Sequence, residues 1–384
     1  MSLFTQLSAS YFFYFSILGL VVPFVGVFLD GKGFSSSDIG EIVAIITASK
    51  IIGPSLWAVL ADKTGQQLTI IRIGALLASC CFSFLFWLNS YWPITFCLAI
   101  FSLFWTAILP QLEVMTLNSI RQSPKIYARI RLWGSIGFIV MAVLAGVGIE
   151  RYSHDAFTVL GLIVLLGLYL STLLLKQPKI YLSHIIATST IKSKVFDFSF
   201  IVFFLAGLML QISFGPYYSF FALFLRDLEY SGIVIGLMIG LAVIAEIIIF
   251  IYAGQLFKFF TIKTLLIFSL FITSIRWALL AQFGNVFWVL VFSQLMHAAS
   301  FGLYHSASIL FISQHFDINQ QSRGQALYVG GVYGLGGAIG AYFAGLLWLD
   351  GAGAQTSFNL AAVIVLIGAV FALFIPLQEK FNIR

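Results

Sequence analysis

The sequence predicts an all-α membrane protein in which twelve transmembrane helices form two similar six-helix halves. Of its 384 residues, 61% are hydrophobic and only 9% are charged. A water-soluble protein carries more charge than this on its surface, so we expect a lipid bilayer to surround the chain. Apolar runs of the ~20 residues that a membrane-spanning helix needs recur along the whole length.

Each half contributes six apolar runs to this prediction. The predicted spans are 7–29, 38–61, 68–88, 93–117, 130–149, 156–175, 198–225, 233–256, 263–281, 286–312, 324–348 and 355–376. The first run has neither a basic residue before it nor a small-residue cleavage site after it, so we interpret it as a retained helix rather than a signal peptide. An even number of spans places both termini on the same side.

The orientation follows from the distribution of basic residues, because cytoplasmic loops carry the positive excess. One set of loops and flanks holds fifteen of the twenty Lys and Arg residues, and the other set holds only Lys32, Arg151 and Arg226. We therefore expect both termini in the cytoplasm of a cell whose inner (plasma) membrane holds the protein. The net charge of +6 fits this rule and anionic lipid, so no nucleic-acid partner is expected.

The longest polar stretch, 176–197, divides the chain into predicted domains at 1–175 and 198–384, with a cytoplasmic linker between them. Shifting the chain by 196 residues aligns the first hairpin of one half with the first hairpin of the other. The aligned pairs are Phe28 with Phe224, Leu29 with Leu225, Phe34 with Tyr230, Ser35 with Ser231, Ile39 with Ile235 and Gly40 with Gly236. Such parallel repeats are typical of transporters, and substrate binds between them.

Glycines at four-residue spacing predict close helix contacts. Gly232, Gly236 and Gly240 follow this spacing in the eighth span, as do Gly336 and Gly340 in the eleventh. Small residues at this spacing let two helix backbones approach each other. The same pattern serves a static contact and a sliding one equally well.

Four ionisable residues are predicted near the middle of the membrane: Lys50, Glu246, Arg276 and His297. A charge there costs about 2.5–3.5 kcal/mol, so such groups usually face a protein interior or an aqueous path. One interpretation is a substrate site in which Lys50 and Arg276 attract an anion while Glu246 and His297 exchange protons. The other is a set of structural ion pairs, and the 196-residue shift does place Lys50 opposite Glu246.

Helical spacing favours His297 over His305 as the proton-exchanging histidine. Tyr304 follows His297 by seven residues and falls on the same face, whereas His305 is expected to point about 80° further round. Aromatic residues are plausible substrate contacts where they share a helix face with a charged residue, as Tyr304 does with His297. The residues predicted to contact substrate are Tyr14, Phe138, Tyr217 and Tyr304.

A second charged pair is predicted nearer the cytoplasm. Glu113 and Arg131 lie equally far from Gln122, so an antiparallel hairpin brings them to the same depth. They are predicted either to contact substrate or a gate, or to form an interfacial ion pair that fixes the hairpin.

The sequence contains no signature of an enzyme. It has no nucleophile elbow, no paired-histidine metal motif and no phosphate-binding loop, so we assign no catalytic residue and no metal site. We expect no cofactor, a proton as the coupling ion, a small-molecule substrate and a monomeric chain.

Several segments resemble the major facilitator superfamily, in particular its 3-phenylpropionate permease group and, more distantly, lactose permease and nucleoside symporters. The segments are Tyr11 to Gly19 with Pro23, Ala128 to Phe138 (ARIRLWGSIGF), Val243 to Phe250 (VIAEIIIF), Ile275 to Trp277 (IRW) and Gln294 to His297 (QLMH). This resemblance implies a proton-coupled symporter that works by alternating access.

The resemblance also implies roles for individual residues. Glu246, Arg276 and His297 match the carboxylate, arginine and histidine of the lactose permease group, and Glu113 with Arg131 matches its sugar-binding pair, followed by Phe138 at a tryptophan position. Ser300 stands where that group has a proton-carrying glutamate, which makes Glu246 the first candidate for this role. The loop motif after the second span is only partly kept, as Asp62, Lys63 and Gly65.

We therefore predict a symporter that imports a small aromatic carboxylate such as 3-phenylpropionate together with a proton. A sugar or nucleoside is the alternative substrate. A sensor without transport activity is a further alternative, although it does not require charges at both equivalent positions.

Overall fold

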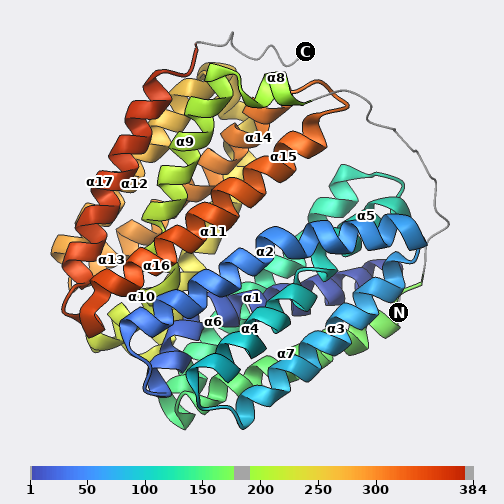
Figure 1. Ribbon diagram of the computed structural model, residues 1–384, viewed down its shortest axis with the longest axis vertical. Helices are drawn as coiled ribbons and strands as arrows, with labels where there is room; N and C mark the ends of the chain where they lie inside the picture. The colour runs from blue at the N-terminus through green and yellow to red at the C-terminus, as the bar shows by residue number, and fades with distance from the viewer. Residues whose placement is uncertain (1, 177–190, 377–384) are drawn as a thin grey trace. The chain divides into compact units, whose positions relative to one another are not determined.

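The computed structural model of the chain describes residues 2–176 and 191–376, and these residues form helices and turns without a strand (Figure 1). Twelve helical spans within them are long and apolar enough to cross a membrane, as predicted. The first six are built from α1 (Leu3–Gly31), α2 (Ser36–Thr64), α3 (Gln67–Ser83), α4 (Tyr91–Trp105), α5 (Ile108–Ser119), α6 (Pro124–Tyr152) and α7 (Asp155–Leu173).

The second six spans follow a short helix, α8 (Lys192–Val195). They are built from α9 (Phe198–Ser213), α10 (Gly215–Asp227), α11 (Gly232–Phe259), α12 (Ile262–Phe283), α13 (Phe287–Leu295), α14 (Tyr304–His315), α15 (Gln321–Tyr328), α16 (Gly337–Trp348) and α17 (Ala354–Leu373). A π-helical segment at Ala298–Leu303 joins α13 to α14, and another at Val329–Gly336 joins α15 to α16.

The fifth span differs most from its predicted start. The apolar run begins at 130, whereas α6 begins at Pro124 and includes Lys125 and Arg129. Proline at the first helical position has the backbone angle that a helix needs. The two basic side chains can keep their charged ends in the interface while their methylene stems cover the helix.

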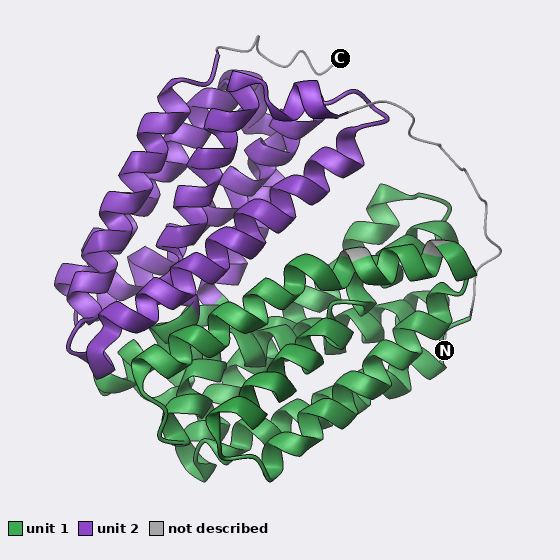
Figure 2. Cartoon of the chain, viewed as in Figure 1, with its two compact units in different colours: residues 1–183, 219–240 green, residues 184–218, 241–384 purple. Residues whose placement is uncertain are grey.

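Packing contacts divide the chain into two compact units (Figure 2). Unit 1 consists of Met1–Ser183 and Ser219–Gly240, and unit 2 consists of His184–Tyr218 and Leu241–Arg384. The short segment Ser219–Gly240 therefore belongs by packing to the unit that also contains the first six spans. Most of the predicted linker, residues 177–190, lies outside the described residues.

Unit 1 is built around α1, which packs most extensively against α6 and α7. Ser16 Oγ donates a hydrogen bond to the carbonyl oxygen of Gly137 on α6 at 3.1 Å. Ser10 Oγ pairs with Ser171 Oγ of α7 at 3.0 Å. A side chain at Gly19 or Gly137 would collide with the backbone of the facing helix, so glycine permits this close approach.

The predicted contact through the glycines of the eighth span is confirmed inside unit 1. Gly232 lies against the backbone of Gly146, and Gly236 lies against that of Val143, both on α6. Gly240 faces Ile139 of the same helix. The four-residue spacing therefore marks the face of α11 that packs on α6.

In unit 2, α17 packs against both α9 and α12. Trp277 Nε1 donates to Ser213 Oγ at 3.1 Å, and Ser274 Oγ donates to the carbonyl oxygen of Ala362 at 3.0 Å. Gly340 of α16 lies against the backbone of Ile212 on α9. The two hydrogen bonds hold α12, which carries a buried arginine, against α9 and α17.

The repeat predicted from the sequence recurs in the geometry of the two hairpins. Helix α1 ends at Gly31 and α2 begins at Ser36, while α10 ends at Asp227 and α11 begins at Gly232, so both boundaries differ by 196. The turn residues Gly33 and Glu229 are also 196 apart, and both have positive φ, 87° and 62°. The two turns therefore share one backbone conformation despite their different residues.

The helix that closes each half is held by a basic residue from the third helix of that half. Arg72 of α3 donates to the carbonyl oxygens of Thr172 and Leu173 in the last turn of α7 and of Leu175 just beyond it. Lys263 of α12 donates to the carbonyl oxygen of Leu373 at the end of α17, at 2.6 Å. Carbonyls at a helix end have no partner in their own helix, so these cations satisfy them and oppose the helix dipole.

Candidate substrate and proton sites

The predicted site residues separate into two clusters, one in each unit. Arg276 on α12, His297 just after α13, and Glu246 on α11 lie in unit 2. Lys50 on α2, Glu113 on α5 and Arg131 on α6 lie in unit 1. Each cluster is described within its own unit.

Arg276 is a completely buried cation whose recorded contacts are neutral or aromatic. Its Nη1 donates to His297 Nδ1 at 2.9 Å, and its Nη2 donates to Gln294 Oε1 at 3.4 Å. The Nε atom has no hydrogen-bond acceptor among the described residues. A buried guanidinium is costly unless it is paired, and the two hydrogen-bond partners named here are neutral side chains.

Aromatic rings surround the same guanidinium. Its carbon atom lies 4.4 Å from the ring centre of Tyr217, 4.5 Å from that of Trp277 and 5.9 Å from that of Phe214. The negative faces of such rings stabilise a cation that water does not reach. Tyr217 also donates its hydroxyl hydrogen to Gln294 Oε1 at 2.9 Å, which fixes the ring against Arg276.

The hydrogen bond from Arg276 determines which nitrogen of His297 carries the proton. A guanidinium can only donate, so Nδ1 must accept and the proton of the neutral ring lies on Nε2. Nε2 is 3.9 Å from Glu246 Oε2, slightly beyond hydrogen-bond length. The side chain of Glu246 is 20% exposed and that of His297 is 7% exposed. Arg276, His297 and Glu246 therefore lie in a row, joined by one hydrogen bond and one longer polar contact.

His305, which was predicted to point about 80° away from the face of His297, lies at the other end of a stack of three rings. The rings of His297 and Phe301 are parallel with centres 5.6 Å apart, and those of Phe301 and His305 are parallel at 6.0 Å. The π-helical segment Ala298–Leu303 lies between the two histidines and has more residues per turn than an α-helix, so the angle between their side chains stays a prediction. His305 Nδ1 contacts the hydroxyl of Tyr333 at 2.9 Å.

Tyr304, predicted as a substrate contact, is almost completely buried. Its hydroxyl has no hydrogen-bond partner among the described residues. Phe138, predicted from the sequence as another contact, lies on α6, and its backbone packs against Gly19 of α1. Roles for these two side chains in substrate binding stay predictions.

In unit 1, Lys50 lies over an aromatic stack. Its Nζ is 5.7 Å from the ring centre of Trp105, and the Trp105 ring stacks on Tyr14 at 5.2 Å and on Phe101 at 5.9 Å. Lys50 is partly buried, and Tyr14 is buried. Trp105 therefore contacts both the Lys50 cation and Tyr14, which was predicted to contact substrate.

Glu113 and Arg131 lie near each other along the α5–α6 hairpin but have different partners. Tyr127 donates its hydroxyl hydrogen to Glu113 Oε1 at 3.2 Å. The guanidinium of Arg131 lies 3.7 Å from the ring centre of Phe15 on α1. In the described residues no ion pair joins the two charges, so each is held by an aromatic side chain instead.

Sequence reasoning missed Gln294, Tyr127 and Trp105 as members of these clusters. Gln294 begins the QLMH segment three residues before His297, and an amide inside an apolar span was the signal available in the sequence. Tyr127 lies 14 residues from Glu113 across a turn, and Trp105 contacts Lys50 from another helix, so only the fold brings these pairs together.

Known proteins of similar sequence or structure are transporters. The chain is 26% identical over 349 residues to the "probable 3-phenylpropionic acid transporter" of Escherichia coli (strain K12), which covers 89% of this chain and 90% of the relative. It is 25% identical to the maltose permease of Geobacillus stearothermophilus over 96% of this chain and 94% of the relative. A crystal structure of a mutant of the nucleoside transporter NupG matches with a TM-score of 0.88 at 17% identity, covering 97% and 100% of the two chains.

The fold and these relatives together define the class: the chain is a transporter that crosses the inner membrane many times and acts on small molecules, not an enzyme. Residues 4–360 match the model of the MFS_1 like family. The chain therefore belongs to this family of the major facilitator superfamily, as the sequence segments predicted.

Proposed function

We propose that the protein imports a small aromatic carboxylate, such as 3-phenylpropionate, together with a proton. The observation that carries this proposal is Arg276, a buried guanidinium with an unpartnered Nε–H and no acidic side chain among its recorded contacts in the described residues. A carboxylate supplies the missing negative charge and matches the planar arrangement of guanidinium donors.

The surroundings of Arg276 suit an aromatic substrate better than a hydroxylated one. Tyr217, Trp277 and Phe214 offer ring faces within 6 Å of the charge that binds the carboxylate. A phenyl ring gains from stacking and from leaving water, whereas sugar hydroxyls need a hydrogen-bond partner each. The relative in Escherichia coli that is named a probable 3-phenylpropionic acid transporter supports the same choice.

Proton coupling is proposed to use the contact between His297 and Glu246. When the substrate carboxylate engages Arg276, it competes with His297 Nδ1 for the guanidinium. His297 Nδ1 is then released from its donor and can accept a proton, and Glu246 lies 3.9 Å from the other nitrogen of the ring. Substrate binding and proton movement are thereby linked through one arginine, with Glu246 as the first candidate for the proton carrier.

Lys50 is proposed as the second cation for the substrate, and the stack of Tyr14 and Trp105 as a second aromatic surface. Tyr304 and Phe138 complete the proposed substrate contacts. We further propose that both termini lie in the cytoplasm, because fifteen of the twenty basic residues fall on that side.

One observation favours a sugar or nucleoside as the alternative substrate. Glu113 with Tyr127, and Arg131 with Phe15, place carboxylate, hydroxyl and guanidinium groups close together in unit 1. Such groups bind hydroxyls, and relatives of this chain are named maltose permease and xanthosine permease.

Uptake into liposomes that contain the purified protein distinguishes the two choices. With an acidic exterior, labelled 3-phenylpropionate is expected to accumulate, and an ionophore that collapses the pH gradient is expected to abolish the accumulation. Liposomes without protein correct for the acid that crosses the bilayer unaided. Accumulation of maltose or xanthosine instead of the aromatic acid would overturn the proposal in favour of the alternative.

A further inference from the structure

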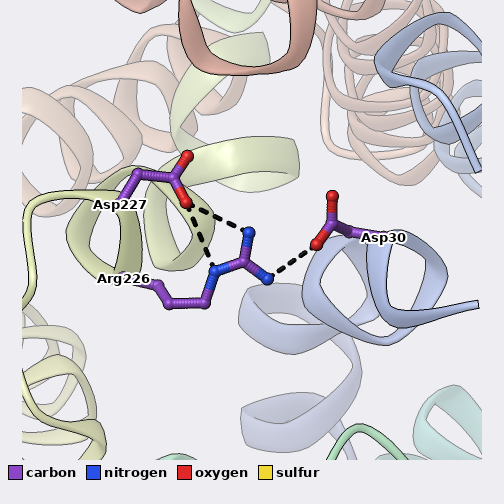
Figure 3. A network of polar contacts seen from close by, with 3 residues as sticks. All are labelled: Asp30, Arg226 and Asp227. Carbon is purple, nitrogen blue, oxygen red and sulfur yellow. Dashed lines mark hydrogen bonds and ion pairs between the residues drawn. The ribbon is translucent and has the colours of Figure 1, made fainter. Parts of the chain in front are cut away.

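A charged contact at one end of α1 is separate from both candidate sites. Arg226, at the end of α10, donates from Nη1 to Asp30 Oδ2 of α1 at 2.6 Å (Figure 3). Asp227 accepts from Nε and Nη2 of the same guanidinium, at 3.3 and 3.0 Å. Arg226 is therefore held between two carboxylates, and each of its three guanidinium nitrogens donates to a carboxylate oxygen.

Asp30 and Arg226 are equivalent positions of the repeat. Their sequence separation is 196, the same shift that aligns the two hairpin turns and their positive-φ residues Gly33 and Glu229. Two equivalent residues of a two-fold repeat can contact each other only near the axis that relates the halves. The pair thus joins the two repeats at their common axis, on the membrane face opposite the chain's N-terminus.

Close backbone packing surrounds this ion pair. Gly26 of α1 lies against the backbone of Ser219 on α10, and Gly232 of α11 lies against that of Gly146 on α6. These glycines bring the hairpin Ser219–Gly240 tightly onto α1 and α6 within unit 1. The rest of α10 and of α11 belongs to unit 2. The boundary between the units therefore falls after Tyr218 in α10 and before Leu241 in α11.

We propose that Asp30 and Arg226 form an outer latch that holds this hairpin closed and must release in each transport cycle. A transporter that offers one site alternately to both sides needs contacts on each face that form and break. The latch suits this role, because its side chains are 39% and 44% exposed. An ion pair at such exposure is weak enough to open and strong enough to shift a balanced equilibrium.

Reversible cross-linking tests the latch without relying on the proposed substrate or proton. Cysteines replace Asp30 and Arg226 in a background with Cys80→Ser, Cys81→Ser and Cys97→Ser, and a short bis-thiosulfonate reagent joins them. The matched control joins cysteines at Lys32 and Asn89, whose side chains meet at 2.9 Å at the same end of α1 but both belong to the first six spans.

Joining the latch positions is expected to stop uptake of whichever labelled solute the unmodified protein transports, and a reductant is expected to restore it. Joining the control positions is expected to leave uptake unchanged. Full uptake with the latch cross-linked would overturn the proposal. The unmodified protein reports separately on the substrate, so failure of the phenylpropionate proposal remains distinguishable.

Charge exchange provides a readout that needs no substrate. A cysteine at Ser219, which is 2% exposed beside Gly26, reports opening by its alkylation with a membrane-impermeant maleimide. Asp30→Arg is expected to speed this alkylation at least about fivefold, and Asp30→Arg with Arg226→Asp to return it towards the original rate. A cysteine at Ser10, fully buried within unit 1, should stay unreactive in all variants. Equal rates at Ser219 in all three proteins would contradict the latch.

Discussion

The ionisable groups of the two units are arranged differently. In unit 1, Lys50 lies over Trp105 and Arg131 over Phe15, so each cation rests on its own aromatic ring. In unit 2, Arg276 also rests on rings, but it is linked through His297 to Glu246. Isolated cations can attract an anion, whereas a chain that ends in a histidine and a carboxylate can also transfer a proton.

Under the proposed mechanism, unit 2 couples substrate to proton and unit 1 contributes recognition. The equivalent positions Lys50 and Glu246 show how the repeat diverged, because one half has a cation where the other has a carboxylate. The following predictions test that division, beginning with the largest expected effect.

Arg276→Gln is expected to reduce uptake of the aromatic acid at least about hundredfold, since it removes the anion-binding charge and the guanidinium donor to His297 Nδ1. Arg276→Lys should retain part of the activity, because it keeps the charge but not the planar fork. Ser274→Ala on the same helix, away from this cluster, should remain near the original rate. Normal uptake by Arg276→Gln would remove the basis of the proposed site.

His297→Asn is expected to lower pH-driven accumulation about tenfold, because asparagine can accept from Arg276 but cannot carry a proton. The matched control is His305→Asn. It changes the other end of the same ring stack, where the partner is the Tyr333 hydroxyl rather than a carboxylate. Accumulation is measured with an acidic exterior for both variants. Equal losses would show that the stack, and not the contact with Glu246, matters.

Lys50→Met is expected to raise KM for the aromatic acid about fivefold with little change in the proton gradient dependence. The change removes the cation that lies over the Trp105 ring. A contact between a cation and an aromatic ring contributes up to about 2 kcal/mol when it is shielded from water. Initial rates across a substrate series give KM and the maximal rate separately. Loss of coupling with an unchanged KM would instead place Lys50 in the proton path.

The smallest expected effect compares the two equivalent turns. Gly33→Ala should lower thermal stability by about 1 kcal/mol, because φ at this position is +87° and alanine resists that region. Glu229→Gly, at φ +62°, should raise stability slightly for the same reason. Melting of the detergent-solubilised protein measures both. Identical shifts from the two variants would show that backbone strain does not govern these turns.

The sequence predicted the twelve spans, the 196-residue repeat and the glycine contacts of α11, because hydropathy and small-residue spacing are local signals. It did not predict the π-helical segment between His297 and His305, because the hydropathy pattern there is that of an ordinary α-helix. It also could not predict that Glu113 and Arg131 have different partners. Glu113 contacts Tyr127 and Arg131 contacts Phe15, and these contacts depend on how α5 and α6 pack against each other and against α1.

The most direct test of coupling in unit 2 follows proton movement itself. Adding 3-phenylpropionate outside liposomes in a weakly buffered medium is expected to alkalinise that medium as substrate and proton enter together. Glu246→Gln is expected to exchange labelled for unlabelled acid across the membrane but to cause no alkalinisation. If Glu246→Gln alkalinised the medium as strongly as the original protein, the proton would travel elsewhere and the assignment of coupling to this cluster would be contradicted.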